Sequence, residues 1–339
     1  MDLQALNDIA VRMVEPGRGI LAADESSGTI KKRFDAINVE STADNRRDYR
    51  EMLFRSEGMR AISGVILYDE TVWQDAADGT PLVKLIEDAG SIPGIKVDEG
   101  AKPLPGFPGE TITYGLDGLP ERLPRYRARG ARFAKWRAVI DIAAGVPTVG
   151  AVRQNAQALA RYAALCQEHD IVPIVEPEVL MDGDHDQARC EGVTRMVLKE
   201  TFDALWDARV ALEGMILKPN MIVSGRKCAT QAGVQEVAEH TIAVLKATVP
   251  SAVPGIAYLS GGQSDEEATA HLDAMNRIGG FPWKMTFSYG RALQAAPQKA
   301  WSGKADNVPA GARAFTHRAE MNGLASRGAW TSEAERAAA

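Results

Sequence analysis

The chain has 339 residues and a formal net charge of −6 at pH 7, with 45% hydrophobic and 25% charged residues. This composition is ordinary for a soluble globular protein, and the acidic balance argues against a protein that binds nucleic acid or lies on a membrane surface. No apolar stretch approaches the roughly 20 residues that a membrane helix needs. The scattered cysteines Cys166, Cys190 and Cys228 predict a chain of the reducing cytoplasm, without a disulfide framework or a zinc site.

Short apolar runs that end in polar or charged residues recur along the chain. Several of them begin with glycine, which is typical of the turn from a helix into a strand. The runs are residues 19–25, 64–70, 94–98, 133–141, 171–178, 214–220, 255–262 and 284–291. Apolar residues at helical spacing fill most of the intervals between them. The predicted helices include 152–169, 190–209, 234–248 and 265–277.

Strands that alternate with helices predict a parallel sheet. Eight such units in a chain of this length favour an α/β fold, the (β/α)8 TIM barrel, as a single domain over residues 1–339. The alternative is a doubly wound open sheet. We disfavour it because no G-x-G-x-x-G pattern follows the first strand, and because polar strand ends recur all along the chain instead of at one switch point.

Three segments outside this pattern carry predictions of their own. Residues 101–124 are rich in proline and glycine and predict a long loop after the third strand. Residues 45–50 predict the charged, exposed face of a helix. After about residue 303 the strand pattern ends; a helix is predicted near 310–322, and the alanine-rich end is predicted to be a loosely ordered tail from about residue 323.

The polar strand ends carry charged side chains, most of them in pairs two residues apart. Because side chains alternate across a strand, both members of a pair point to the same face. The pairs are Ala22 and Asp24, Lys96 and Asp98, Lys135 and Arg137, and Glu176 and Glu178. At one barrel mouth the acids Asp24, Glu176 and Glu178 would stand against the cations Lys96, Lys135, Arg137, Lys218 and Arg291. This predicts a net positive mouth, which favours an anionic small molecule such as a phosphate. Trp136 lies between two of the cations in sequence and is predicted to face the helices as core.

Lys218 stands near the end of the apolar run 214–220 and is followed at once by a proline. An ammonium group at the end of a buried strand must pair with an acid or give up its proton, and a neutral lysine is a nucleophile for carbonyl groups. The acids of 171–178 are its predicted partners. A lone buried pair of this kind could equally be a structural ion pair, but the convergence of several ionisable groups favours chemistry.

Two loops are candidates for ligand binding. Ser260, Gly261 and Gly262 form either a simple turn or a nest of backbone amides that binds phosphate, with Arg291 as the charged partner. The acidic loop 182–186 has the composition of a metal site. Its spacing does not match a calcium loop, and the histidines of the chain are scattered, so we predict no metal.

The motifs at these strand ends resemble those of class I fructose-1,6-bisphosphate aldolases, the metal-independent Schiff-base family, from about residue 15 to residue 305. The resemblance implies a (β/α)8 barrel, no cofactor, a sugar bisphosphate as substrate and a cytoplasmic homotetramer. The motifs that carry it are Gly-Ile-Leu-Ala-Ala-Asp-Glu-Ser, Gly-Ile-Lys-Val-Asp, Phe-Ala-Lys-Trp-Arg, Ile-Val-Pro-Ile-Val-Glu-Pro-Glu, Leu-Lys-Pro-Asn-Met, Leu-Ser-Gly-Gly-Gln-Ser and Phe-Ser-Tyr-Gly-Arg-Ala-Leu-Gln.

The same resemblance implies a role for each matching residue. Lys218 would attack the ketose carbonyl, Glu176 would move protons, and Asp24 would orient the intermediate. Lys135 would stabilise the negative charge that develops beside Lys218. Glu178 would be the supporting glutamate of the motif Ile-Val-Pro-Ile-Val-Glu-Pro-Glu. The residues implied for one phosphate are Arg33, Ser260, Gly261, Gly262, Ser288, Gly290 and Arg291. The residues implied for the other phosphate are Ser26, Thr29, Lys96 and Arg137.

The predicted function is therefore the glycolytic lyase reaction: reversible aldol cleavage of fructose 1,6-bisphosphate to dihydroxyacetone phosphate and glyceraldehyde 3-phosphate. Lys218 must be neutral to attack the ketone, and the protonated imine that it forms is a better electron sink than the ketone itself. The alternatives are a Schiff-base aldolase for another phosphorylated ketose and a non-catalytic sugar-phosphate-binding scaffold. A scaffold is disfavoured because each expected catalytic position carries a competent residue.

Overall fold

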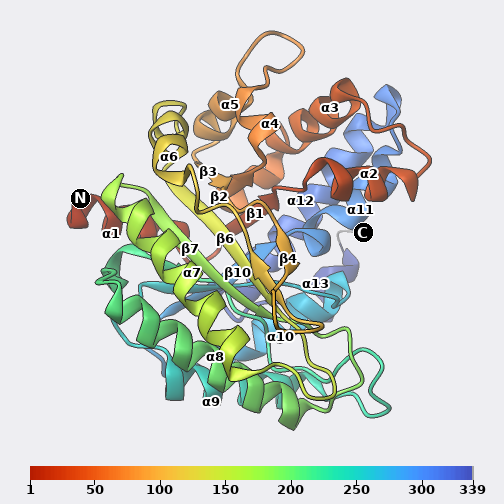
Figure 1. Cartoon of the computed structure of the whole chain (residues 1–339). Coiled ribbons are helices and arrows are strands. Elements are labelled where there is room, and N and C mark those ends of the chain that lie inside the picture. The colour runs from red at the N-terminus through yellow and green to blue at the C-terminus, as the bar shows by residue number, and fades with distance from the viewer. Residues whose placement is uncertain (338–339) are drawn as a thin grey trace.

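The structure is a computed structural model that describes residues 1–337, and its centre is a closed barrel of parallel strands (Figure 1). Around the barrel the strands follow the order β1, β10, β9, β8, β7, β6, β3, β2. Each predicted strand is confirmed, and the doubly wound alternative is wrong because the sheet closes on itself. The barrel strands are β1 (Gly19–Ala23), β2 (Ile62–Leu67), β3 (Ile92–Lys96), β6 (Phe133–Ile140), β7 (Val172–Val179), β8 (Ile216–Leu217), β9 (Gly255–Tyr258) and β10 (Lys284–Tyr289).

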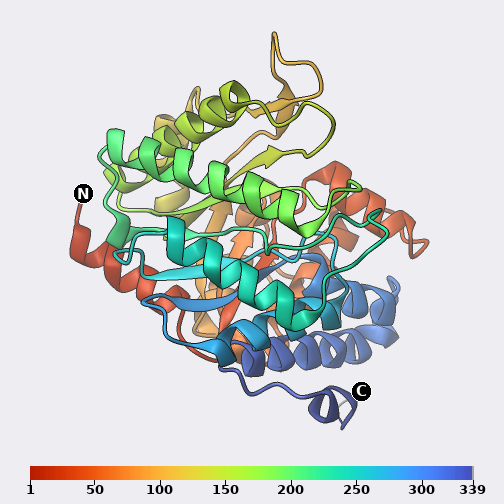
Figure 2. The ribbon, with the colours of Figure 1, turned by 90° about the horizontal axis from the view of Figure 1, so that it is seen from below.

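Helices form the outer layer around the strands (Figures 1 and 2). The four helices predicted between strands are confirmed as α7 to α10. Within residues 1–337, none of the helices combines the length and the apolar character needed to cross a bilayer. The α-helices are α1 (Leu3–Met13), α2 (Ser27–Asp35), α3 (Ala43–Phe54), α4 (Asp69–Trp73), α5 (Leu82–Asp88), α6 (Leu119–Ala128), α7 (Val149–Glu168), α8 (Gln187–Asp207), α9 (Val234–Thr248), α10 (Asp265–Ile278), α11 (Arg291–Trp301), α12 (Val308–Ala325) and α13 (Ser332–Ala337). Short 3-10 turns are η1 (Glu57–Ala61), η2 (Leu212–Gly214) and η3 (Ala305–Asn307).

Apolar side chains fill the interior of the barrel at the amino ends of the strands. Ile92, Phe133 and Ile216 belong to this cluster, and the buried face of α1, including Leu6, packs into it. The Phe133 ring lies so close to Gly94 that a Cβ atom at this glycine would be 2.2 Å from the ring. Since α1 and the ring fill this end, only the carboxyl ends of the strands are free to form a site.

The opposite face of each strand packs against the helices. Trp136 of β6 is fully buried there, and its ring stacks on Tyr162 of α7 with ring centroids 5.6 Å apart. The predicted core position of Trp136 is confirmed. The alternation that turns Trp136 outward is the same alternation that turns Lys135 and Arg137 toward the interior of the barrel.

The segment 101–124 is more regular than predicted. It contains an antiparallel hairpin of β4 (Ala101–Pro103) and β5 (Thr111–Thr113), and α6 begins at Leu119. The hairpin is tied to the barrel because the hydroxyl of Thr113 donates to the carbonyl of Arg137 at 2.7 Å. The prediction of a long loop was wrong because strands this short leave only a weak alternating pattern among the prolines and glycines.

The segment 45–50 is not the exposed charged face that was predicted. Arg50 of α3 is only 1% exposed, and Tyr49 is equally buried. The Arg50 guanidinium donates to the Glu70 carboxylate at 3.4 Å and to the Glu25 carbonyl at 3.3 Å. Helical periodicity does not show which face of α3 is buried, and a charged residue is buried only where tertiary structure supplies its partners.

The end of the chain also differs from the prediction of a loosely ordered tail. Helix α12 continues to Ala325, and α13 follows after a short connection. Glu335 of α13 is 7% exposed, and its carboxylate accepts a hydrogen bond from the buried guanidinium of Arg318. Polar contacts such as this one hold the segment in place. The prediction rested on its low content of large apolar residues, which carries no information about such contacts.

Candidate active site

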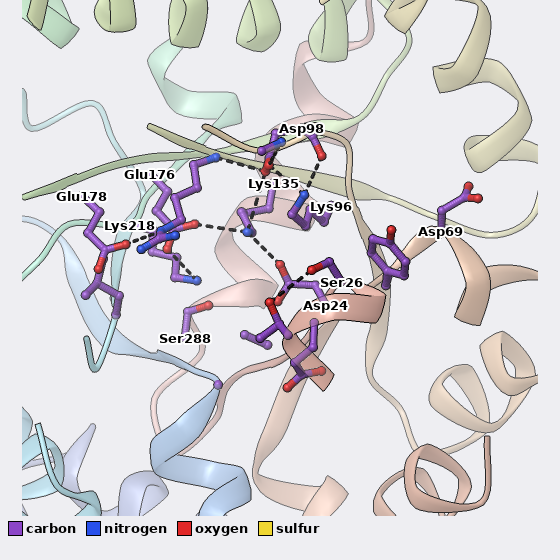
Figure 3. Close-up of a pocket in the computed structure, with 18 of the residues that line it drawn as sticks. Asp24, Ser26, Asp69, Lys96, Asp98, Lys135, Glu176, Glu178, Lys218 and Ser288 are labelled. Atoms are coloured by element: carbon purple, nitrogen blue, oxygen red, sulfur yellow. Dashed lines mark hydrogen bonds and ion pairs between the residues drawn. The ribbon is translucent and has the colours of Figure 1, made fainter. Parts of the chain in front are cut away.

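A cavity of about 1050 Å³ opens at the carboxyl ends of the barrel strands (Figure 3). Every predicted site residue except Gly262 lines it. The lining residues that were predicted are Asp24, Ser26, Thr29, Arg33, Lys96, Lys135, Arg137, Glu176, Glu178, Lys218, Ser260, Gly261, Ser288, Gly290 and Arg291. The strand-end pattern therefore brought together residues that are far apart in the sequence.

Buried charged side chains form a connected network inside this cavity. The Lys135 Nζ atom lies 2.7 Å from Oδ2 of Asp24 and 3.5 Å from Oε2 of Glu176. The Lys218 Nζ atom lies 3.0 Å from Oε1 of Glu176. Glu176 thus bridges the two lysines, as Figure 3 shows. Lys218 is 4% exposed and Glu176 is 3% exposed, so water screens these contacts only weakly.

The register of the barrel explains why these groups meet. Asp24 directly follows β1, while Lys135 and Glu176 lie on the neighbouring strands β6 and β7. Lys218 lies just beyond the short strand β8, where its backbone N–H donates to the carbonyl of Val175 at 2.8 Å. This backbone bond holds Lys218 beside β7, next to the carboxylate of Glu176.

The charges of Asp24 and Lys135 stabilise each other. Burial raises the pKa of Asp24, but the positive charges of Lys135 and Lys218 outweigh burial and lower this pKa to about 2. Burial lowers the pKa of Lys135, but the carboxylates of Asp24, Glu176 and Asp98 outweigh it and raise this pKa well above its usual value. At neutral pH the cavity therefore contains a fixed anion and a fixed cation 2.7 Å apart.

The low pKa of Asp24 predicts a pH-dependent contribution to stability. The ordinary pKa is 3.8 and the folded value is about 2, so the contribution is fully present above about pH 4 and is lost as the pH falls toward 2. We expect Asp24→Asn to lower the free energy of unfolding by on the order of 2 kcal/mol at pH 6, and by less as the pH falls below 4. Urea unfolding of both proteins across this range measures the difference. A difference that does not change with pH would contradict the prediction.

Two further ion pairs lie beside this network. Lys96 Nζ is 2.7 Å from Oδ1 of Asp98, and Asp98 also lies 3.9 Å from Lys135 Nζ. The guanidinium of Arg137 donates to the carboxylate of Glu178. Burial lowers the pKa of Arg137, but Glu178 outweighs burial and raises it. Glu178 therefore holds Arg137 in place, and Asp98 holds Lys96, so both cations have fixed positions for an anionic ligand.

The loop after β9 has the backbone geometry of an anion nest. Gly261 has a φ of +54°, in the left-handed region that favours glycine. The guanidinium of Arg291 donates to the carbonyl of Gly261. The buried hydroxyl of Ser288 has no hydrogen-bond partner among the described residues, which leaves it free to donate to a ligand. The cavity at this end therefore offers hydroxyl groups, a positive-φ turn and the cation of Arg291.

Gly262 is the exception among the predicted residues. Its N–H donates to the Sδ atom of Met181 at 2.9 Å, and it does not line the cavity. Gly262 therefore belongs to the support of the loop. Its amide would need to exchange the sulfur for a ligand oxygen before it could bind phosphate.

Known proteins of one family resemble this chain over almost its whole length. The family model described as Fructose-bisphosphate aldolase class-I matches residues 5–339. The chain is 52% identical to the "Probable fructose-bisphosphate aldolase class 1" of Xanthomonas campestris pv. campestris, across 97% of this chain and 99% of that protein. The chain belongs to the class I fructose-bisphosphate aldolase family. The resemblance seen in the motifs is confirmed, and with it the assignment as a lyase.

Two further aldolases are similar to this chain. The non-muscle type fructose-bisphosphate aldolase of Lethenteron camtschaticum is 53% identical, across 95% of this chain and 90% of that protein. A solved structure of the fructose-bisphosphate aldolase from Plasmodium falciparum, in complex with TRAP and a small-molecule inhibitor, superposes with a TM-score of 0.96. The two chains are 47% identical, and the match covers 97% of this chain and 96% of the other. The barrel described above is therefore the fold of the aldolase family.

The aldolase cavity is less positive than the sequence predicted. Additional acids line it and neutralise most of the cations, leaving an excess of a single positive charge. The cations are Arg33, Lys96, Arg122, Arg125, Lys135, Arg137, Lys218 and Arg291, and the acids are Asp24, Glu25, Asp69, Asp98, Glu99, Glu176 and Glu178. An anionic substrate is therefore attracted by individual cations at fixed positions and gains little from the net charge of the cavity.

Sequence reasoning left several lining residues of the aldolase site without a role. Glu25 pairs with the guanidinium of Arg33 and accepts a hydrogen bond from Gln294 at 2.7 Å. Asp98 was recognised as the partner of Lys96 in the strand pattern but was not assigned to the site. The polar ends of the runs 19–25 and 94–98 are the signal that could have found both acids.

The outer part of the cavity was also missed. It contains Trp73, Arg125 and Tyr126, of which the last donates to Asp69 at 2.7 Å. The guanidinium of Arg125 lies over the Trp73 ring, 5.7 Å from its centroid. These residues come from α4 and α6, so the strand-end argument could not reach them.

No group of three metal-ligating side chains is found among residues 1–337. In the acidic loop 182–186, Asp186 caps α8 by accepting a hydrogen bond from the N–H of Arg189 at 2.8 Å. This structural role accounts for one of the acids in that loop.

Proposed function

We propose that this aldolase cleaves fructose 1,6-bisphosphate reversibly to dihydroxyacetone phosphate and glyceraldehyde 3-phosphate, through an imine between Lys218 and C2 of the sugar. The observation that carries the proposal is the position of the Lys218 amine. It is buried in the cavity, 3.0 Å from a Glu176 carboxylate that also contacts Lys135. A buried amine beside a proton carrier and a second cation is the arrangement that imine formation requires.

The order of the strands supports an assignment of the two phosphates. β9 is adjacent to β8, which Lys218 follows, whereas β3, which carries Lys96, lies on the opposite side of the closed barrel. The imine carbon C2 is one carbon from the C1-phosphate and four carbons from the C6-phosphate. We therefore place the C1-phosphate at the loop after β9. Its proposed contacts are Ser260, Gly261, Ser288, Gly290, Arg291 and Arg33.

The C6-phosphate is then proposed to lie toward the ends of β1 and β3. Beyond the end of β1, Ser26 and Thr29 have their hydroxyl oxygens 3.1 Å apart at the start of α2. Lys96 and Arg137, fixed by their acidic partners, provide the positive charge. Holding both ends of the substrate directs the binding energy of its remote groups into alignment of C2 with the Lys218 amine.

In the proposed reaction the neutral Lys218 amine adds to C2 and forms a carbinolamine. Glu176, which has taken the proton that the Lys218 nitrogen loses, gives it to the departing hydroxyl, water leaves, and a protonated imine remains. Loss of the C4 hydroxyl proton to the Glu176 carboxylate then allows the C3–C4 bond to break, with its electron pair entering the imine to form an enamine. Asp24 orients this intermediate, and Lys135 stabilises the negative charge that develops near Glu176.

Borohydride reduction in the presence of dihydroxyacetone phosphate tests the central step. Reduction converts an imine into a stable amine, so we expect irreversible loss of activity and a mass increase on the peptide that contains Lys218. Borohydride without substrate is the control and should leave the enzyme active. The proposal fails if the enzyme turns over substrate while the peptide containing Lys218 stays unmodified.

We also propose that the protein works as a homotetramer in the cytoplasm. The support is the family resemblance, together with few and scattered cysteines, which are typical of a reducing compartment. Sedimentation velocity of the purified protein tests the assembly, and a single species of monomer mass would contradict it.

A further inference from the structure

A strap formed by residues 328–335 lies against α10 and α12 at the end of the described chain (Figure 2). The N–H of Trp330 donates to Oδ1 of Asp273 in α10 at 2.8 Å. Arg277, one turn further along α10, donates to the carbonyls of Gly328 and Trp330 at 3.2 and 2.6 Å. The strap therefore follows the carboxyl-terminal part of α10 and then turns toward its first turn.

Glu335 at the end of this strap contacts the buried guanidinium of Arg318 from α12. Its carboxylate also accepts hydrogen bonds from Trp330 Nε1 at 2.8 Å and from His317 Nε2 at 2.9 Å. Arg318 is 4% exposed, and a guanidinium buried to this degree is stable only with an anionic partner. The Glu335 carboxylate supplies the contact that holds Arg318 in its present position.

Arg318 in turn connects the strap to the first turn of α10. Its Nη2 atom donates to the Thr269 hydroxyl at 2.7 Å and to the carbonyl of Asp265 at 3.3 Å. Asp265 is the first residue of α10, and Ser264 caps this helix. The loop that we assign to the C1-phosphate, residues 260–262, ends two residues before this cap.

A second set of contacts joins the same loop to α10. His271 Nδ1 and Gln263 Oε1 lie 2.5 Å apart, and Gln263 Nε2 donates to the Ser260 carbonyl at 3.0 Å. Burial lowers the pKa of His271 to about 4, so the ring is neutral at pH 7. A neutral ring has one N–H, which donates here to the Gln263 oxygen. Any shift of α10 is thereby transmitted to the backbone of the loop 260–262.

We propose that Glu335 is a positioning residue for the C1-phosphate. Through Arg318 it fixes the first turn of α10, and through this turn it fixes the loop 260–262. The proposal rests on the function and the phosphate assignment given above. Glu335 touches no residue of the cavity, so its effect is on the geometry of substrate binding, and the imine chemistry at Lys218 is unaffected.

The test compares Glu335→Ala with Glu333→Ala in the same short helix. Glu333 is exposed, and its carboxylate contacts Arg336 at 3.6 Å and the neighbouring Ser332 hydroxyl at 3.5 Å, so it is a matched control. For Glu335→Ala we expect the KM for fructose 1,6-bisphosphate and for fructose 1-phosphate to rise by the same factor, about threefold to tenfold, with kcat changed by less than about twofold. The inhibition constant of inorganic phosphate should rise in parallel. Glu333→Ala should match the unmodified enzyme.

A third variant keeps the test decisive if Glu335→Ala does not fold. Glu335→Gln keeps one acceptor oxygen for Arg318 or Trp330, replaces the other by an NH2 group that cannot accept a hydrogen bond, and loses the charge, and we expect a smaller rise in KM in the same direction. Unchanged KM values for both substrates together with a lower melting temperature would overturn the proposal and leave only a stabilising role for the strap. Borohydride trapping at Lys218 should persist in every variant, so failure of this proposal is distinguishable from failure of the imine mechanism.

Discussion

Replacing Lys218 by methionine is expected to reduce cleavage of fructose 1,6-bisphosphate by at least about 10⁴-fold, because the nucleophile and the electron sink are lost together. The side chain is unbranched and similar in length, so the buried position beside Glu176 stays filled. The substrate keeps its phosphate contacts, so its binding should change far less than the rate. Steady-state kinetics and a substrate-binding measurement on the same preparation separate the two effects.

Lys218→Arg is the informative companion variant. Arginine keeps a positive charge beside Glu176, but a guanidinium does not form the imine. We expect the same loss of activity and no product of borohydride reduction at this position. If Lys218→Arg retained substantial activity, Lys218 would act only through its charge, and the covalent mechanism would be wrong.

Replacing Lys135 by methionine is expected to damage both stability and catalysis. Lys135 Nζ lies 2.7 Å from Asp24, 3.5 Å from Glu176 and 3.9 Å from Asp98. Removing it takes away the ion-pair partner of the buried Asp24 and leaves Glu176 and Asp98 with one cation each, and we expect a loss of about 3–5 kcal/mol in the free energy of unfolding. Activity should fall by at least about 10²-fold, because Glu176 loses one of the two lysines that hold its carboxylate in position.

The matched control for this variant is Lys199→Met on α8. Lys199 pairs with Asp203 at 2.5 Å, but both side chains are exposed. Its replacement should change the free energy of unfolding by less than about 1 kcal/mol and leave kcat unchanged. Urea unfolding and steady-state kinetics on the two variants measure the contrast. Equal losses of stability would show that burial does not strengthen the Lys135 contacts.

The positions of the candidate catalytic groups followed from local rules. Because side chains alternate along a strand, Glu176 and Glu178 had to share a face, and so did Lys135 and Arg137. Because the carboxyl ends of parallel strands meet at one mouth, residues from distant parts of the chain had to converge there. The structure confirms both expectations, since all of these side chains line one cavity.

The errors arose where partners distant in sequence decide the outcome. Arg50 was expected at the surface, but Glu70 and the Glu25 carbonyl allow it to be buried. The C-terminal segment was expected to be loosely ordered, but Arg318 provides a buried partner for Glu335. Gly262 was expected to face a phosphate, but the sulfur of Met181 takes its amide. No local pattern around these residues contains the information about their partners.

The amino-acid sequence by itself determined the barrel, its eight strands and the candidate chemistry at Lys218, because these depend on hydrophobic periodicity and on the residues that follow each strand. Only the tertiary structure decided which acid pairs with which base, how many acids neutralise the cavity, and how α13 is joined to α10. Those features depend on distances of a few ångströms between side chains that are far apart in sequence, and electrostatic and hydrogen-bond energies change steeply over such distances.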